Sequence, residues 1–355
     1  MNKAMACIFP IRPDRKIIMW ELTRKCNVFC KHCISDAKAA STENELSTEI
    51  IMSIMDELVS LGFNELYLTG GEPSLRPDYI DILEYAKKRF QYLAAATNGY
   101  KLSEEYFEKS SSLGLNHLNI SLDHHRPDMH DGLRGLKGSF REAIISIKRL
   151  LEADVPVHIS TAITNHNCRD LESIVNFVKS MGIKAIVFNW IIPLGRAEFN
   201  IDYLPEKSEY PSIITEIKRL YRIYELEKKF PRILYRRYIT NGQTPLEMCP
   251  GGRTSFFITS SGKVSPCSFL ARFPQGQFVF GDLSIQNFSD IVYSKSFQTA
   301  LETLRSRGRN IPECVKCDVL ECGYGCPAFS YVWGGNLNHI DPICGRGKLN
   351  DISSK

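Results

Sequence analysis

The spacing of apolar residues changes repeatedly between two patterns along roughly the first 200 positions. Short continuous apolar runs, such as residues 17–20 and 66–68, are typical of buried strands. Between such runs, apolar residues recur at helical spacing, as they do from Ser47 to Val59, and Gly62 then marks the end of the helix. The pattern therefore predicts an α/β protein in which strands and helices alternate.

Six strand-and-helix units are expected before residue 200. The strands are predicted at residues 17–20, 66–68, 92–97, 118–122, 155–163 and 185–192. Helices are predicted from Ser47, at 78–89, at 103–113, from Ser139 (with Glu142 forming a capping box) and at 170–181. Short connections between such units imply parallel strands joined by right-handed crossovers, so we expect a partial (β/α)6 barrel of the TIM type. Its active site should lie at the carboxyl ends of the strands.

The pattern changes twice after the barrel, which we place at residues 15–200. Residues 201–245 are polar and are expected to form a helical bridge, whose basic clusters we interpret as solvated faces or as guides for a substrate. Residues 246–346 are rich in Gly, Pro and aromatic residues, with short β-like pieces at 255–259 and 277–280. This last segment is expected to be a small metal-stapled domain.

Composition excludes several classes of protein. The 355 residues are 43% hydrophobic and 24% charged, an ordinary globular balance. A net charge of +4, with both signs mixed along the chain, gives no reason to expect a nucleic-acid or membrane-surface partner. Neither a signal peptide nor a long apolar stretch is evident, so we expect a cytoplasmic protein.

The unusual feature is the set of 12 cysteines, which an intracellular chain uses for metal binding or catalysis more often than for disulfides. Cys26, Cys30 and Cys33 form one group near the start, and Cys7 and Cys168 stand apart. The remaining seven lie in the last third: Cys249, Cys267, Cys314, Cys317, Cys322, Cys326 and Cys344. Two modules, each with its own metal chemistry, are therefore expected.

Three thiolates within eight residues can converge on one metal centre. One interpretation is a structural zinc site that His32 completes. The other is an iron–sulfur cubane, which four cysteines commonly hold. With three cysteines, one iron of the cubane would stay open to a non-protein ligand.

The motif Cys26-Asn-Val-Phe-Cys30-Lys-His-Cys33, followed by Gly70-Gly71-Glu72-Pro73 after the next strand, resembles the radical S-adenosylmethionine (SAM) superfamily. The resemblance implies that Cys26, Cys30 and Cys33 bind a 4Fe–4S cluster whose fourth iron is chelated by SAM. It also implies that the segment Gly70 to Pro73 holds the methionyl amino group. Reductive cleavage of SAM would then yield a 5′-deoxyadenosyl radical that abstracts a substrate hydrogen.

Further positions carry over from the same resemblance. His32 lies where a ring normally rests against adenine, and Asn98 and Ser121 occupy positions that often contact SAM. Arg134 resembles the arginine that pairs with the carboxylate of SAM. The alternative for each is a role in a turn, a cap or the surface.

The later cysteines are similar to the SPASM extension of radical SAM maturases, apart from four residues between Cys317 and Cys322 where five are usual. The similarity implies two auxiliary 4Fe–4S clusters, three in all with the SAM-binding one. The nearer would use Cys249, Cys267 and Cys326, and the distal Cys314, Cys317, Cys322 and Cys344. Seven cysteines cannot fill eight positions, so either one iron is open or Cys7, Cys168 or another residue completes the set. Zinc in place of the clusters is the alternative.

The function that these resemblances imply is modification of a peptide or protein by cross-linking, thioether formation, oxidation or epimerisation. Cys168, after the fifth strand, is a candidate hydrogen donor to a substrate radical, or else a buried structural thiol. Oxidation, decarboxylation or epimerisation of a tetrapyrrole or sugar is the alternative, since heme-pathway relatives share the opening Trp20 to Cys26. An iron–sulfur electron-transfer or redox-sensing protein is a third interpretation.

Two protein partners are expected beside the substrate. One is a reductant such as flavodoxin or ferredoxin. The other is a separate leader-peptide recognition protein, because the motif begins at Cys26 and leaves no room before it for a recognition domain.

Overall fold

The computed structural model describes residues 15–39, 44–226, 232–235, 249–273, 276–316, 325–342 and 344. Its strands are β1 (Ile17–Glu21), β2 (Glu65–Thr69), β3 (Tyr92–Thr97), β4 (His117–Ser121), β5 (Val157–Ile163), β6 (Ala185–Trp190), β7 (Arg232–Tyr235), β8 (Ser255–Ile258) and β9 (Val264–Ser265). The first helices are α1 (Thr48–Ser60), α2 (Tyr79–Lys87), α3 (Glu104–Ser112), α4 (Pro127–Arg134), α5 (Ser139–Glu152), α6 (Leu171–Ser180) and α7 (Tyr210–Tyr221). The later helices are α8 (Phe288–Val292), α9 (Lys295–Ser306), α10 (Pro312–Val315) and α11 (Pro327–Gly334).

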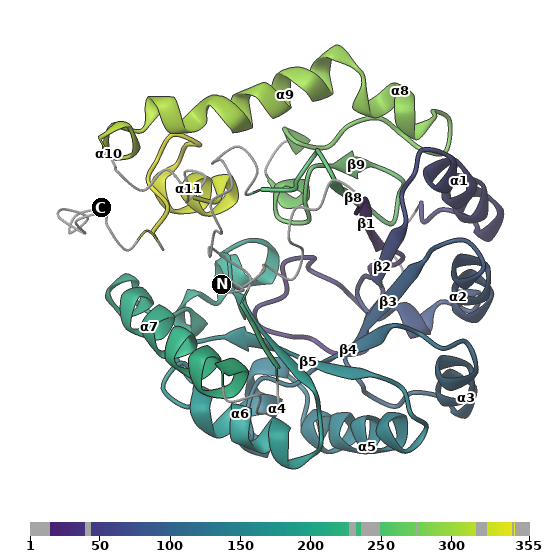
Figure 1. The fold of residues 1–355 in the computed structure, drawn as a ribbon, viewed down its shortest axis with the longest axis vertical. Coiled ribbons are helices and arrows are strands. Elements are labelled where there is room, and N and C mark those ends of the chain that lie inside the picture. Colours follow the sequence, from purple (N-terminus) through teal and green to yellow (C-terminus); the bar gives the residue numbers. More distant parts are fainter. Residues whose placement is uncertain are drawn as a thin grey trace.

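One curled sheet contains all nine of these strands in the order β7-β6-β5-β4-β3-β2-β1-β8-β9. Neighbouring strands are parallel except β8 and β9, which pair antiparallel. Helices α1, α2, α3 and α5 follow the outside of the curve, and α8 and α9 cross above β8 and β9 (Figure 1). The expected partial barrel with six parallel strands at its centre is therefore confirmed.

The structure adds elements that the apolar pattern did not predict. At one edge β7 pairs with β6, and at the other β8 pairs with β1, so the sheet continues beyond the six expected strands. Helix α4 was not expected. Residues 277–280 form no strand; their pairing is a single bridge between Phe280 and Val264. Short segments of this kind carry too few apolar positions to reveal a period.

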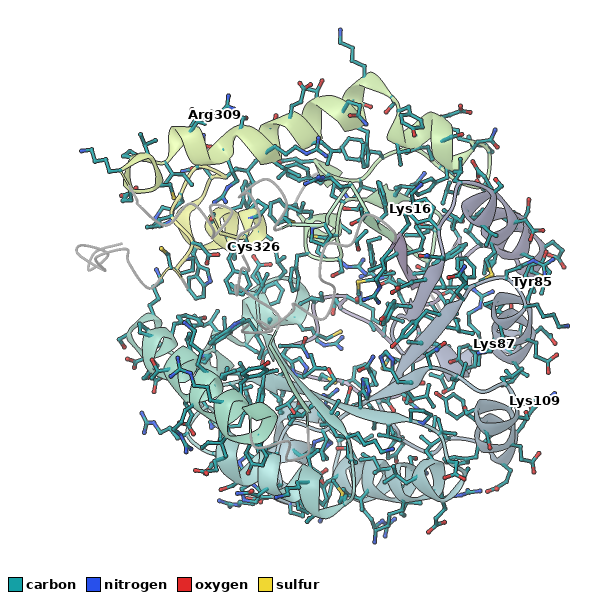
Figure 2. All side chains as sticks on the ribbon, viewed as in Figure 1. Lys16, Tyr85, Lys87, Lys109, Arg309 and Cys326 are labelled. Atoms are coloured by element: carbon teal, nitrogen blue, oxygen red, sulfur yellow. The ribbon has the colours of Figure 1, made fainter. Side chains whose placement is uncertain are left out.

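The two faces of the sheet differ in chemistry. Residues on the outer face, such as Trp20, Leu68 and Ile120, are fully buried in one continuous core with the surrounding helices. The inner face instead carries polar and aromatic side chains, and Figure 2 shows side chains extending from the strands into the enclosed space. A barrel of this type normally fills its interior with bulky aliphatic residues, so the polar inner face marks the site. Among the described residues, no helix is both long and apolar enough to span a membrane.

The start of α5 corrects a local prediction. Ser139 was expected to cap this helix with Glu142, but Ser139 is its first residue and the cap comes from Asp131 within α4. The Asp131 carboxylate accepts from the backbone N–H groups of Gly138 (2.6 Å) and Phe140 (2.7 Å) and from the hydroxyl of Ser139 (2.8 Å). A capping group from a preceding helix satisfies the same free N–H groups as a local one.

We expect Asp131→Ala to lower the free energy of unfolding by about 1–2 kcal/mol, because it removes the cap of α5. The matched variant Glu142→Ala should change it by less than about 0.5 kcal/mol. Urea denaturation of both proteins checks this. A larger loss of unfolding free energy in Glu142→Ala than in Asp131→Ala would indicate that the local capping box of Ser139 and Glu142 stabilises α5.

Candidate functional site

The cysteine motif follows β1 directly and forms a buried loop at the carboxyl ends of the strands. Cys26 and Cys30 are buried and Cys33 is partly buried. The Sγ of Cys26 accepts from Asn98 Nδ2 at 3.7 Å, and the Sγ of Cys30 accepts from Arg134 Nη1 at 3.5 Å. Hydrogen-bond donors aimed at sulfur fit thiolates that ligate an iron–sulfur cluster.

Burial of the thiols changes their pKa values. Burial raises the pKa of Cys26 to about 11 and also raises the pKa of Cys30, where Arg134 opposes it. Metal binding requires thiolates, so loading a cluster must release these protons. Within the described ranges, no three metal-ligating side chains lie close enough to share a single ion.

Gly70 and Gly71 are needed because two backbone segments meet there. A Cβ on Gly70 would lie 2.5 Å from the carbonyl oxygen of Thr23, and one on Gly71 would clash with the carbonyl of Lys25. Two backbone hydrogen bonds also join the segments. Gly71 N–H donates to Thr23 O (2.7 Å), and Glu72 N–H donates to Lys25 O (2.8 Å). These glycines therefore hold the chain that enters the cysteine loop.

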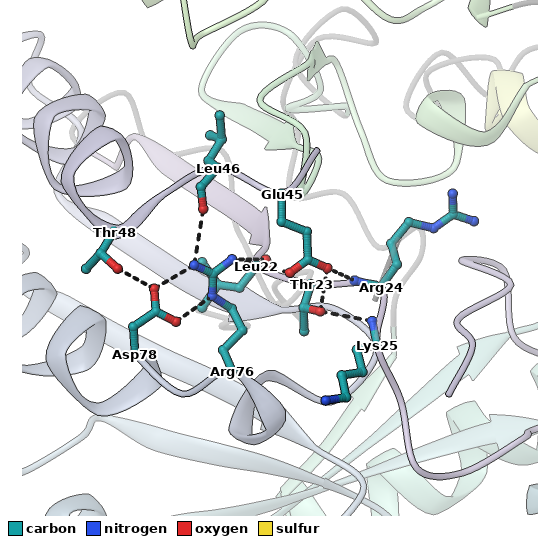
Figure 3. Close-up of polar contacts among 9 residues, drawn as sticks. All are labelled: Leu22, Thr23, Arg24, Lys25, Glu45, Leu46, Thr48, Arg76 and Asp78. Carbon is teal, nitrogen blue, oxygen red and sulfur yellow. Dashed lines mark hydrogen bonds and ion pairs between the residues drawn. The ribbon is translucent and has the colours of Figure 1, made fainter. Parts of the chain in front are cut away.

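Arg76 supports the same entry segment from the side (Figure 3). Its guanidinium donates to Leu22 O (3.0 Å), Leu46 O (3.2 Å), the Asp78 carboxylate (2.9 and 2.6 Å) and Glu45 (3.5 Å). Glu45 in turn accepts from the Thr23 hydroxyl at 2.7 Å. A planar guanidinium suits this role because it can serve several acceptors at once.

Glu72 is fully buried and turned towards the end of β3 rather than into the cavity described below. Its carboxylate accepts from the Thr97 hydroxyl (3.0 Å), Asn98 N–H (2.7 Å) and Ser74 hydroxyl (2.8 Å). Burial raises the pKa of Glu72 although these donors oppose the shift. In this structure Glu72 therefore links the ends of β2 and β3 and so places Asn98 beside Cys26.

Arg134 is paired within the protein. Its Nε donates to Asp123 Oδ2 at 2.6 Å, and both side chains are buried. Burial alone would raise the pKa of Asp123, but Arg134 and the nearby His32 and His130 lower it to about 2. Arg134 is thus held between Asp123 and Cys30.

A cavity of about 770 Å³ opens inside the barrel next to the cysteine loop. Of the predicted SAM-contacting residues, the lining includes His32, Gly70, Gly71, Asn98, Ser121 and Arg134, together with the three cysteines. Glu72 and Pro73 are not in the lining. The structure thus brings most of these separated residues to one place, as the rule on strand ends predicts.

The floor of the cavity carries neutral hydrogen-bonding groups. His117 Nδ1 contacts the Tyr92 hydroxyl at 2.8 Å, His117 Nε2 contacts Asn119 Nδ2 at 3.0 Å, and the ring stacks on His158 with centroids 4.1 Å apart. Burial, with a contribution from His158, lowers the pKa of His117 to about 3. Burial likewise lowers the pKa of His32 to about 4. Both rings are therefore neutral at pH 7.

Arg196, which follows β6, was missed in the sequence. Its Nε donates to Cys30 O (3.0 Å), its Nη1 donates to Ala37 O (2.5 Å), and its backbone N–H donates to Cys33 O (2.9 Å). The preceding Gly195 has a φ of +60°, and a Cβ there would lie 2.5 Å from Ile34 O. The strand-end rule, applied to β6, could have drawn attention to Gly195 and Arg196.

Cys168 lies on the loop after β5, as expected, but it is not in the cavity lining. It is buried in the hydrophobic core, where its Sγ is 3.7 Å from the carbonyl oxygen of Asn165. This position favours the packing role over donation of hydrogen to a substrate.

The backbone segments that carry Cys249 and Cys267 lie next to each other, and so do those that carry Cys326 and Cys344. A Cβ on Gly251 would lie 3.4 Å from Cys249 Sγ and 3.0 Å from Pro266 O, next to Cys267. Asp341 accepts from Cys326 N–H at 2.7 Å and its carbonyl accepts from Cys344 N–H at 2.8 Å. Figure 2 labels Cys326, at the start of α11. Cys314 is partly buried, and Cys7, Cys317 and Cys322 lie outside the described residues.

Comparisons with known proteins agree with this arrangement. The family model of the radical SAM superfamily matches residues 20–178, and that of SPASM, an iron–sulfur cluster-binding domain, matches residues 249–318. An AdoMet-dependent heme synthase of Methanosarcina barkeri is 27% identical over 352 residues, covering 93% of this chain and 96% of that protein. The subtilosin biosynthesis protein AlbA of Bacillus subtilis is 28% identical over 338 residues, covering 94% and 71%. Streptococcus suis SuiB bound to its precursor peptide SuiA has a similar fold, with a TM-score of 0.75, 14% identity and coverage of 93% and 76%.

We expect Arg196→Ala to accelerate amide hydrogen exchange in residues 30–38 and to lower the iron content after reconstitution. The variant loses two hydrogen bonds to loop carbonyls, worth together about 2 kcal/mol. Arg196→Lys should fall between it and the wild type, because an ammonium lacks the planar fork. Exchange mass spectrometry of the full chain checks this, with the exposed Arg219→Ala as control. Unchanged amide hydrogen exchange in residues 30–38 of Arg196→Ala would show that Arg196 does not hold this loop.

We also expect the buried His117 on the cavity floor to make the stability of the protein depend on pH. The unfolded chain protonates His117 below about pH 6.5, whereas the folded chain does so only near pH 3, so the free energy of unfolding falls as the pH falls. The contribution between pH 7 and about pH 5 is about 2 kcal/mol. His117→Gln should reduce this slope in urea denaturation while buried His32 keeps its own contribution, and the exposed His166→Gln should leave the slope unchanged. Parallel slopes in all three proteins would be evidence that His117 is not buried as a neutral ring.

Proposed function

The chain is a radical SAM enzyme with a C-terminal SPASM domain, and from this we propose that it modifies a peptide or protein. Cys26, Cys30 and Cys33 would hold the SAM-binding 4Fe–4S cluster, with Gly70, Gly71, Asn98, Ser121 and Arg134 around SAM. When bound, SAM and the cluster supply a 5′-deoxyadenosyl radical that removes a hydrogen atom from the substrate. The later cysteines would hold two auxiliary clusters, and a reductant such as flavodoxin or ferredoxin would supply electrons.

The charge of the cavity carries this proposal. The two arginines in its described lining are both paired, Arg15 with Glu65 and Arg134 with Asp123. His32 and His117 are neutral. A tetrapyrrole with several carboxylates would need cations to offset its charge, whereas neutral hydrogen-bonding groups suit amides and hydroxyls. The lining therefore favours a peptide.

Action on a carboxylate-bearing tetrapyrrole is the second candidate. Its support is the alignment with an AdoMet-dependent heme synthase over nearly the full length of both chains. A tetrapyrrole brings carboxylate charges that the cavity would have to neutralise, whereas the amides of a peptide do not. A test with both kinds of substrate therefore separates the two candidates.

Anaerobically reconstituted enzyme with reductant and SAM should form 5′-deoxyadenosine slowly by itself. We expect peptides encoded beside the gene to accelerate formation about tenfold or more and to change in mass, and we expect iron coproporphyrin III to have no effect. Acceleration by the porphyrin with loss of carboxyl groups would replace the first proposal by the second. Cys26→Ala, the control, should abolish formation in every case.

A further inference from the structure

Glu21 is a buried carboxylate at the rim of the cavity. It is the last residue of β1, its side chain is on the inner face of the sheet, and it is 1% exposed. Among the described residues, the contacts given above that hold the cysteine loop by its backbone or bind sulfur do not involve this carboxylate. Its role therefore needs a separate explanation.

The two oxygens of this carboxylate are in different situations. Oε2 accepts from the Ser35 hydroxyl at 2.9 Å and forms an ion pair with Arg272, whose Nη2 also lies 3.0 Å from Ser35 Oγ. Oε1 is buried and receives no hydrogen bond from any residue that the structure describes, and the Nε of Arg272 is likewise buried without an acceptor there. A buried carboxylate oxygen without a donor is costly, and the cost is relieved when a donor occupies the adjoining space.

Position and charge indicate what this donor is. Ser35 follows Cys33 closely and Arg272 follows Cys267 on the same stretch of chain, so Glu21 lies between the two cysteine modules. Arg272 already offsets the charge of Glu21, so the ligand group need not be a cation. A carboxylate is disfavoured because it has no proton to donate at pH 7.

We propose that Glu21 Oε1 is a binding site for a hydrogen-bond donor, an N–H or O–H group, of the molecule that occupies the cavity. Two sources share this chemistry: an amide or hydroxyl of the substrate, and a hydroxyl or amino group of SAM. This assignment rests on the proposed function in one respect, namely that the cavity holds both SAM and the substrate. Ser35 and Arg272 are positioning residues that hold Oε2 and thereby aim Oε1.

Three probes distinguish the sources: SAM itself, N-methylacetamide as a neutral N–H donor, and propionate as a group without one. The main variant combines Glu21→Leu with Arg272→Met, because replacing both partners of a buried pair by apolar residues is better tolerated than removing one. Glu21→Gln is the conservative variant, since its carbonyl still accepts. Glu104→Gln is the control, because Glu104 pairs with Arg149 on the surface. Iron content and unfolding temperature verify that each reconstituted full-length protein is folded.

Affinity for SAM is measured by equilibrium dialysis, and N-methylacetamide and propionate are followed by saturation-transfer NMR with SAM present. If the donor belongs to the substrate, the double variant binds N-methylacetamide about tenfold more weakly and SAM unchanged. If it belongs to SAM, the affinity for SAM falls about tenfold instead. The affinities of Glu21→Gln for SAM and N-methylacetamide should stay within about threefold of the wild-type values, and those of Glu104→Gln should equal the wild-type values.

The proposal is overturned if the double variant binds both SAM and N-methylacetamide like the wild type, or if propionate binding is lost in parallel with N-methylacetamide. These results are independent of the peptide assay. A tenfold loss at Glu21 together with no stimulation by any peptide would keep this site and remove the peptide proposal.

Discussion

The contact between two backbone segments, Gly70–Gly71 and Thr23–Lys25, is the constraint on which the site depends. It joins the chain leaving β2 to the chain leaving β1 at a distance that no side chain permits. The cysteine loop begins at the end of this contact, so its origin is fixed relative to the sheet. Arg76 braces the entry of the loop and Arg196 binds the carbonyls further along it. Three different strand ends thus converge on one short loop.

Charge in the cavity is balanced locally. Arg134 is matched by Asp123, Arg15 by Glu65, and Arg272 by Glu21, while the histidines His32 and His117 are kept neutral by burial. Paired charges with satisfied partners are much less costly in a buried site than isolated ones. A lining of this kind orients polar groups without attracting ions, which suits chemistry that must exclude water.

The C-terminal part is integrated through β1. Strand β8 pairs with β1 along four residue pairs, and Arg272 from the segment after Cys267 reaches Glu21 at the end of the same strand. The first cysteine module also starts from β1. One strand therefore sets the position of both modules, and the side chains of Glu21 and Ser35 connect them.

The sequence alone determined the alternation of strands and helices, the parallel barrel and the identity of the cysteine motifs, because periodicity and local spacing are properties of neighbouring residues. The bounds of β3 match the prediction, and β4 differs by one residue. The tertiary structure decided what depends on distant contacts. Asp131 rather than Ser139 caps α5, Cys168 is turned into the core, and β8 joins the sheet beside β1. Arg196 and Glu21 acquired their partners in the same way, since the direction of a side chain and the segment it meets follow from packing and not from spacing along the chain.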